Sequence, residues 1–294
     1  MGTKFEEHLA EEMKKYKGVS FPVKTGFLWR FLIKKVSCTR LHPNPDDEFT
    51  MPSVGPSYRI ISEYMQKFKY DDEAGTQSRQ EPIIVEKMHP DGYLIINGHH
   101  RWAAYYMRGQ KSVPVDIVNL THEEDLKEML KGAVHDKRVT MDLDEVVFCS
   151  DDNEPAEKEL SFPYNRIYKE KIRAGIPALF HYLAGHGYDI WVYSSKFYSM
   201  DYIRNFLKRY HVHINGIVTG VAKKYTSLQK SDFDRMIAGR YQYTLHIDRE
   251  TVLKINNRTK DFEEFKIDSE KDNWSQGIMD IVGEFKKDEE EKTD

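Results

Sequence analysis

The sequence predicts an α/β protein of two domains, and three observations carry this prediction. Its 294 residues are about the length of two ordinary domains. The second half contains apolar runs that end in acids or hydroxyls, with helical stretches between them, which is typical of a parallel sheet. The first half contains shorter strands around one helix, which indicates a separate domain of mixed α and β structure.

The N-terminal segment predicts an amphipathic helix, because the apolar residues Phe5, Leu9 and Met13 recur every four positions. We expect this helix to pack its apolar face on a domain core; the alternative is that it packs on a partner. Acidic residues such as Glu6 and Glu11 lie between them, so the segment does not resemble a secretory or transit signal.

Three strands and a helix follow in the first half. Residues 81–87 and 93–96 are apolar runs separated by a His-Pro-Asp-Gly turn over 89–92, which predicts a pair of joined strands. The segment 97–106 reads as the entry to a helix, and residues 113–118 form another apolar run. This order predicts a small α+β domain.

The loop that opens this helix is a candidate anion site. Gly98 allows the backbone to approach an anion closely, and His99 and His100 follow it at the helix start. The amides of a first helical turn and a planar guanidinium such as that of Arg101 are groups that bind phosphate. In the alternative interpretation, His99 and His100 are a hydrogen-bonded pair that caps the helix.

Residues 36–120 resemble the ParB/sulfiredoxin-like fold in this strand-loop-helix pattern. The Gly-His-His-Arg form of the loop is most similar to the free serine kinase branch. That resemblance implies that residues 98–101 bind a nucleotide such as ATP, ADP or CTP. It also implies a carboxylate that activates a substrate hydroxyl, for which Glu48 is the candidate by position and Asp47 the next.

Two other activities of this fold do not suit the sequence. Sulfiredoxins carry a catalytic cysteine where this chain has His99, and Cys38 and Cys149 lie elsewhere. Partition proteins of the ParB type follow the domain with a helix-turn-helix DNA reader, whereas this chain continues into strands and acids. Both features argue against sulfiredoxin chemistry and chromosome partitioning.

The most informative stretch is residues 137–148, where an apolar run contains Asp142 and Asp144. A parallel strand would deliver both carboxylates to the carboxyl edge of a sheet, where ligands bind in open α/β folds. Alternate residues of a strand point to opposite faces, so the chain must leave the extended conformation at Leu143 if both are to reach one substrate. In the alternative interpretation, the Asp-x-Asp pair is only a turn or a helix cap.

Other polar residues follow at later strand ends. A helical stretch over 176–186 leads into an apolar strand that ends at Ser194 and Ser195. Lys223 and Lys224 stand in a loop after the next apolar run. The last strand, over 243–248, ends at Asp248. The further candidate site residues are therefore Ser194, Lys223, Lys224 and Asp248.

This order of carboxylate pair, hydroxyl, ammonium and carboxylate resembles the haloacid dehalogenase-like (HAD) superfamily of phosphotransferases, over residues 134–285. The resemblance implies a Rossmannoid parallel-sheet domain in which Asp142 is the nucleophile and Asp144 the general acid/base. It implies that Ser194 hydrogen-bonds the phosphoryl group. Cations must then neutralise the two anions that meet in the transition state.

The resemblance supplies those cations as well. Lys223 or Lys224 would offset the negative charge, and Asp142, Asp144 and Asp248 would hold magnesium. One departure is Arg249, which follows Asp248 where the family often has a second acid nearby, and which could weaken or alter the activity. The segment 149–177 is short for a cap domain, so we expect little or no cap and an open site.

Composition favours two soluble domains and a cytoplasmic location. The net charge of −4 and the pI near 6.3 argue against a generic nucleic-acid binder. No apolar run approaches the ~20 residues of a membrane span, and the two cysteines give no disulfide framework. The expected organisation is a ParB/sulfiredoxin-like domain over 1–133, a HAD-like domain over 134–285 and a charged, disordered tail over 286–294.

The predicted function is a magnesium-dependent phosphohydrolase that acts through an aspartyl-phosphate and is coupled to a nucleotide-binding module. Its expected partner is a phosphorylated small molecule or nucleotide; a nucleic-acid end is not favoured by the net charge, and no membrane is expected. One alternative is a small-molecule kinase that uses Gly98 to Arg101. The other is a non-catalytic scaffold that senses nucleotides.

Overall fold

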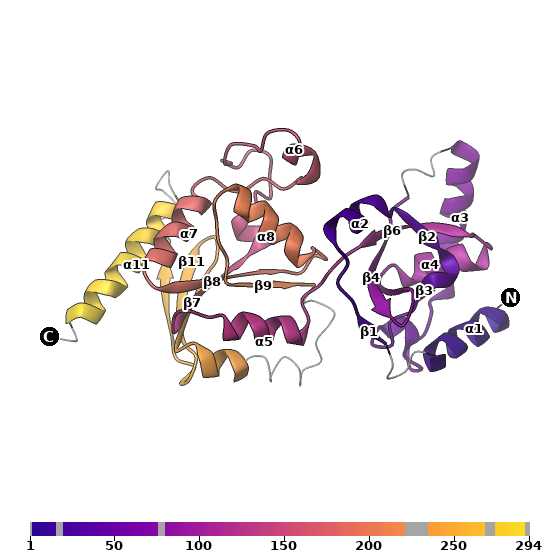
Figure 1. Ribbon diagram of the computed structural model, residues 1–294, viewed down its shortest axis with the longest axis horizontal. Helices are drawn as coiled ribbons and strands as arrows, with labels where there is room; N and C mark the ends of the chain where they lie inside the picture. Colours follow the sequence, from indigo (N-terminus) through magenta and orange to yellow (C-terminus); the bar gives the residue numbers. More distant parts are fainter. Residues whose placement is uncertain (1, 16–19, 76–79, 221–234, 268–273, 292–294) are drawn as a thin grey trace. The chain divides into compact units, whose positions relative to one another are not determined.

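The chain divides into two units in the computed structural model, Met1–Asn119 and Leu120–Asp294 (Figure 1). The structure describes residues 2–15, 20–75, 80–220, 235–267 and 274–291. The predicted boundary after residue 133 differs from this division. The reason is α5 (Glu123–Lys131), whose Leu126, Met129 and Leu130 are buried in the core of the second unit.

The first unit is a mixed α+β structure. Its described helices and strands are α1 (Gly2–Lys15), β1 (Phe21–Pro22), α2 (Phe27–Leu32), β2 (Lys35–Ser37), β3 (Leu41–His42), α3 (Tyr58–Ala74), β4 (Ile83–His89), β5 (Tyr93–Asn97), α4 (His99–Met107) and β6 (Ser112–Ile117), with short 3-10 helices η1 (Cys38–Arg40) and η2 (Glu48–Thr50).

The sheet of the first unit has the order β2-β6-β4-β5-β3, and β1 pairs with β4. Strands β4 and β5 are antiparallel, whereas β6 runs parallel to β4 on its other side. The predicted strands near 81–87, 93–96 and 113–118 and the helix after residue 97 are therefore confirmed.

Helix α1 packs on this unit as predicted. Phe5 and Leu9 are buried in its core, and the ring of Phe5 lies 5.7 Å from that of Trp102 on α4. On the other side of α4, Tyr105 stacks on Phe68 of α3 with 4.2 Å between ring centroids. Aromatic side chains from three helices thus contribute to this core.

The second unit is built on a longer sheet. Its described helices and strands besides α5 are β7 (Lys137–Asp142), the π-helical turn η4 (Leu143–Val147), α6 (Tyr164–Ile167), α7 (Ile176–Gly185), β8 (Tyr188–Ser194), α8 (Met200–Arg209), β9 (Gly216–Thr219), β10 (Tyr243–Ile247), β11 (Thr251–Asn256), β12 (Phe262–Lys266) and α11 (Trp274–Glu291).

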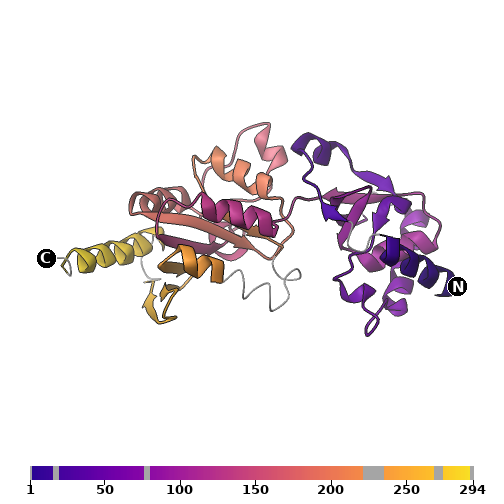
Figure 2. The same cartoon turned by 60° about the horizontal axis from the view of Figure 1, so that its bottom comes forward.

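The sheet order is β12-β11-β10-β7-β8-β9. Strands β10, β7, β8 and β9 are parallel, and β11 and β12 are antiparallel additions at one side. Figures 1 and 2 show helices on both faces of this sheet, and β8 and β9 are almost wholly buried. The four parallel strands bring their carboxyl ends to one edge of the sheet.

Two details of this unit differ from the sequence expectations or refine them. The segment between η4 and α7 contains the short helix α6 and two isolated bridges, Phe148 to Ile172 and Ala156 to Arg173. It therefore has little regular secondary structure. Helix α11 continues to Glu291, whereas a disordered tail was expected from residue 286. Lys and Glu are good helix formers, so the charged composition of this segment is compatible with a helix.

None of the helices in the described part of the chain combines the length and the apolar character needed to cross a lipid bilayer.

Gly216 on β9 sets a limit on packing in the second unit. A Cβ atom at this position would lie 2.0 Å from the ring of Trp191, which is fully buried and donates a hydrogen bond of 2.9 Å to the Tyr241 hydroxyl. Gly216→Ala should therefore lower the free energy of unfolding by about 1–3 kcal/mol, the usual cost of overpacking a core. Urea denaturation followed by tryptophan fluorescence measures this loss.

The matched control is Gly185→Ala at the end of α7, where an added Cβ meets nothing within 4 Å. Alanine has the higher helix propensity, so this variant should be as stable as the wild type or slightly more stable. Equal stability of Gly216→Ala and Gly185→Ala would contradict the packing account.

Candidate functional site

Three predicted site residues stand at the carboxyl edge of the parallel strands. Asp142 ends β7, Ser194 ends the neighbouring β8, and Asp248 directly follows β10 on the other side. Met141 pairs with Ile247, so Asp248 comes next to Asp142 in the register. The structure therefore brings together the strand ends that the sequence order indicated.

Asp142 connects the strand to the turn that follows. Its Oδ1 accepts hydrogen bonds from the amides of Asp144 at 2.7 Å and Glu145 at 2.9 Å, which caps the π-helical turn η4. The extended backbone thus ends at Leu143, as the two-carboxylate interpretation required. Asp142 is also a cap, as the alternative interpretation proposed, and this role uses only one of its two carboxylate oxygens.

Asp144 is held by two groups from the end of β8. The Ser194 hydroxyl donates to its Oδ2 at 2.7 Å, and the Lys196 ammonium lies 3.0 Å from its Oδ1. The Lys196 amide in turn donates to the Ser194 hydroxyl at 3.0 Å. The side chain of Asp144 is 12% exposed, so this carboxylate is mostly shielded from water.

Lys196 was not among the residues that the sequence singled out. It stands two positions beyond Ser194, and the available signal was a cation directly after a polar strand end. The predicted cations, Lys223 and Lys224, lie outside the described residues. Among the described residues, Lys196 is therefore the cation that pairs with Asp144.

Tyr198 is a further residue that the sequence did not indicate. Burial raises the pKa of its hydroxyl, and the negative charges of Glu170 and Asp144 raise this pKa further. The phenol therefore stays protonated at neutral pH and can donate a hydrogen bond to a carboxylate. Glu170 is itself held by the Tyr202 hydroxyl at 2.5 Å.

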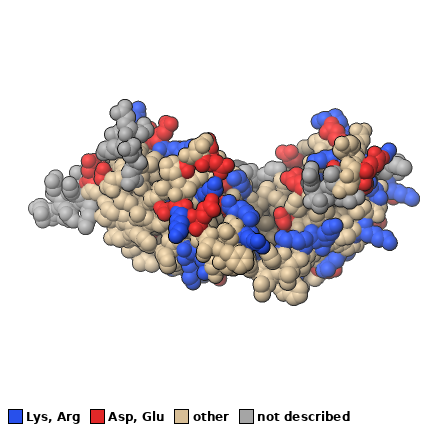
Figure 3. All heavy atoms as spheres, turned by 90° about the horizontal axis from the view of Figure 1, so that it is seen from above, with Lys and Arg blue, Asp and Glu red and all other residues tan. Residues whose placement is uncertain are grey.

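A cleft of about 360 Å³ opens over Asp144. It carries three lysines and two aromatic side chains together with acidic and polar groups; its lining is Asp144, Phe148, Cys149, Ser150, Asp151, Asp152, Lys169, Glu170, Lys171, Lys196 and Tyr198. Figure 3 shows acidic and basic side chains gathered next to one another on a face of this unit. Lys171, for example, lies 3.0 Å from Asp152.

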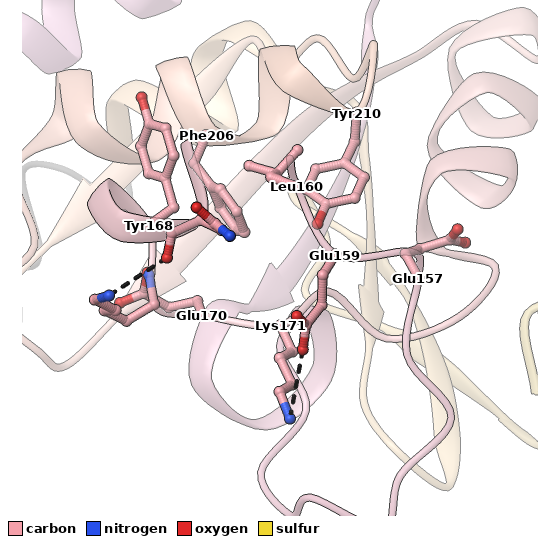
Figure 4. A pocket seen from close by; sticks show the side chains of 10 residues that line it. Glu157, Glu159, Leu160, Tyr168, Glu170, Lys171, Phe206 and Tyr210 are labelled. Carbon is pink, nitrogen blue, oxygen red and sulfur yellow. Dashed lines mark hydrogen bonds and ion pairs between the residues drawn. The ribbon is translucent and has the colours of Figure 1, made fainter. Parts of the chain in front are cut away.

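A smaller pocket of about 110 Å³ shares residues 169–171 with this cleft. Leu160, Phe206 and Tyr210 lie together along one side of it, whereas the ion pair of Glu159 and Lys171 lies on another (Figure 4). Space for an apolar group therefore lies next to the charged cleft.

The acids at the sheet edge suit magnesium in type, because their donors are all carboxylate oxygens. Asp142 and Asp248 are neighbours in register, but within the described residues no three His, Cys, Asp or Glu side chains are grouped closely enough to hold a metal ion. The predicted metal set of Asp142, Asp144 and Asp248 therefore stays a prediction. Magnesium commonly uses one or two carboxylates and completes its shell with water and substrate phosphate.

The predicted anion loop of the first unit has the expected backbone. Gly98 has a positive φ of 102° and precedes α4, a conformation that favours glycine. A Cβ there would lie 3.0 Å from the Arg101 guanidinium, which folds back over this glycine. The side chain of Arg101 is only 5% exposed and pairs with Glu81, and it donates to Asn97 at 3.2 Å.

The two histidines of this loop make contacts within the unit. His99 accepts from the Asn44 amide at 3.1 Å, and His100 accepts from the Ser57 amide at 3.1 Å. These contacts bring the segment that contains Glu48 next to the loop, and Glu48 itself is exposed. Both histidines are therefore hydrogen-bonded, as the alternative interpretation expected, but they stand inside α4 and do not cap it. Nucleotide binding by residues 98–101 stays a prediction.

Neither cysteine is set up for thiolate chemistry. Burial raises the pKa of the Cys38 thiol to about 11. Burial and the nearby Glu154 carboxylate also raise the pKa of Cys149. Both thiols are protonated at neutral pH, which agrees with the argument against a sulfiredoxin reaction.

One family of known proteins matches part of the chain. The family model of the ParB N-terminal domain matches residues 61–133, which run from α3 through β4, β5, α4 and β6 to the end of α5. The ParB-like interpretation of this region is therefore confirmed. No curated protein matches the chain.

Proposed function

We propose that the second unit is a HAD-like, magnesium-dependent phosphohydrolase that acts through an aspartyl-phosphate at Asp142. One observation carries the proposal: two carboxylates leave β7 at the carboxyl edge, and the end of β8 supplies a hydroxyl and an ammonium to the second of them. Asp248, at the end of β10, adds a third acid to this edge.

The first step is attack on phosphorus. Oδ1 of Asp142 is occupied by the two amides of η4, so Oδ2 is the oxygen that forms the new bond to phosphorus. The bond from phosphorus to the leaving oxygen breaks, and Asp144, which enters this step protonated, gives that oxygen its proton. Lys196 limits the repulsion between the attacking carboxylate and the phosphoryl group by adding positive charge to this end of the sheet.

The second step releases phosphate. Asp144 takes a proton from a water molecule as the water attacks phosphorus, and the bond to Asp142 breaks. The Ser194 hydroxyl fixes the Asp144 carboxylate between these two proton transfers. Both residues then return to their starting states.

Asp142 and Asp248 are the residues that would hold magnesium. Bound there, the ion would neutralise the charge that develops on the phosphoryl oxygens. A phosphorylated small molecule or nucleotide is the substrate class that we propose, because the cleft combines Lys169, Lys171 and Lys196 with aromatic side chains.

Binding of a nucleotide such as ATP, ADP or CTP to residues 98–101 is a separate prediction for the first unit. The described contacts of Arg101, His99 and His100 are all made within that unit and support a structural role for the loop. They do not favour the kinase alternative over the phosphohydrolase.

The test is hydrolysis of an aryl phosphate by the full chain, with magnesium and with EDTA. Phosphate release should require magnesium and should stop when EDTA removes the ion, because the carboxylates alone add negative charge to a negative substrate. Undiminished release in EDTA, or no release with magnesium, would contradict the proposal.

A further inference from the structure

Glu154 is paired with two arginines close to the acidic edge of the second unit. The guanidinium of Arg249 lies 3.0 Å from its Oε1, and that of Arg173 lies 3.4 Å from its Oε2. The amide and hydroxyl of Ser150 also donate to this carboxylate, at 3.1 and 3.0 Å. We refer to Glu154, Arg173 and Arg249 as the Glu154 cluster.

The Glu154 cluster is attached to the turn that carries Asp144. Nε of Arg249 donates to the carbonyl oxygen of Glu145 at 2.7 Å, and Nη2 of Arg173 donates to the same oxygen at 3.0 Å. Arg249 also donates to the Ser150 hydroxyl. The guanidinium of Arg249 is therefore directed onto η4 and the loop after it.

The backbone of Arg249 is fixed as well. Its carbonyl accepts a hydrogen bond of 2.8 Å from the Trp274 indole, and the Arg173 guanidinium lies 5.1 Å above the Trp274 ring. Trp274, the first residue of α11, thus contacts both arginines.

The position of Arg249 in the sequence matters for the proposed metal site. Arg249 directly follows Asp248, which is the register neighbour of Asp142. A long cationic side chain at this place could pair with either carboxylate and repel a divalent ion. In the structure, its guanidinium is instead paired with Glu154.

We propose that Glu154 is a positioning residue that draws the Arg249 guanidinium onto η4 and thereby keeps the edge between Asp142 and Asp248 open to a divalent cation. This inference rests on the proposed function, because it assigns magnesium to that edge. It also explains how Arg249 can follow Asp248 directly without its guanidinium occupying the proposed cation site.

The charge state of Glu154 supports this role. Burial alone would raise its pKa, but the hydrogen bonds from Ser150 and the positive charges of Arg173 and Arg249 together lower it. Glu154 is therefore ionised at neutral pH. Removal of its charge would leave two adjacent guanidinium groups without the carboxylate with which both of them pair.

The experiment is magnesium binding by calorimetry on the full chain, without substrate. Glu154→Gln keeps the size of the side chain and one acceptor oxygen but removes its charge. It should weaken magnesium binding about tenfold at low salt, because an unpaired cation then faces the metal site. The weakening should shrink at high salt, where exposed charges are screened.

The double variant Glu154→Gln/Arg249→Gln separates this role from a merely structural one. It should bind magnesium nearly as well as the wild type, because the competing cation is gone. The matched control is Glu159→Gln, on the same loop, whose side chain is 73% exposed and 4.0 Å from Lys171; it should change nothing.

Two results would overturn the inference: unchanged magnesium binding by Glu154→Gln, or a double variant that binds as weakly as the single one. No binding by the wild type would overturn it too, since there would be no cation site to protect. Wild-type magnesium binding without hydrolysis of any phosphate ester would instead overturn the proposed function and leave the role of Glu154 standing.

Discussion

Asp142→Asn should lower magnesium-dependent hydrolysis of an aryl phosphate by at least about a thousandfold, because it removes the nucleophile of a covalent mechanism. The amide oxygen of asparagine can still accept from the amides of Asp144 and Glu145, so the cap of η4 should remain. The measurement is the steady-state rate at saturating magnesium, with circular dichroism and the melting temperature as checks on folding.

The matched control for this variant is Asp261→Asn. Asp261 is exposed, directly precedes β12 and does not line the cleft. Its replacement should leave the rate within about twofold, as expected for a surface change that touches no reacting group. Activity of Asp142→Asn at the wild-type level would exclude Asp142 as the nucleophile.

Asp144→Asn should slow the reaction by about 10²- to 10⁴-fold on an alkyl phosphate, the usual contribution of a general acid. An alkoxide is a poor leaving group and needs the proton, whereas an activated phenolate leaves readily without it. The loss in the phosphoryl-transfer step should therefore be much smaller on an activated aryl phosphate. Single-turnover release of the two alcohols by one enzyme preparation measures both effects.

Asparagine can keep a hydrogen bond with Ser194 but loses the ion pair with Lys196. A purely structural effect of Asp144→Asn would disturb the turn and slow both substrates equally. Equal losses on the alkyl and the aryl phosphate would therefore exclude Asp144 as the general acid.

The parts of the site that could be predicted from sequence are those that depend on order along the chain. Apolar runs that end in polar residues mark strand ends, and parallel strands carry their ends to one edge. This reasoning placed Asp142, Ser194 and Asp248 at the edge where the structure has them. It also predicted that the extended backbone ends at Leu143, because the carboxylates of Asp142 and Asp144 would otherwise point to opposite faces of the strand.

The parts that escaped prediction depend on contacts between residues far apart in the chain. Glu154 and Arg249 are paired across a separation of 95 residues. The sequence singled out Arg249 as the neighbour of Asp248, but no local pattern indicated Glu154 as its partner. Arg101 was expected to bind an anion, and its side chain is buried against Gly98 and paired with Glu81. The expected domain boundary after residue 133 left α5 in the first domain, whereas its apolar face packs in the core of the second unit.

The central claim is a covalent phosphoryl group on Asp142, and reductive trapping tests it most directly. Borohydride reduces an acyl phosphate to an alcohol, so an aspartyl-phosphate formed during turnover becomes homoserine at that position. Peptide mass spectrometry of the full chain, quenched with borohydride during hydrolysis, should find homoserine at residue 142 only when substrate and magnesium are both present. Homoserine at another aspartate, or active turnover with residue 142 always recovered as unmodified aspartate, would contradict the account.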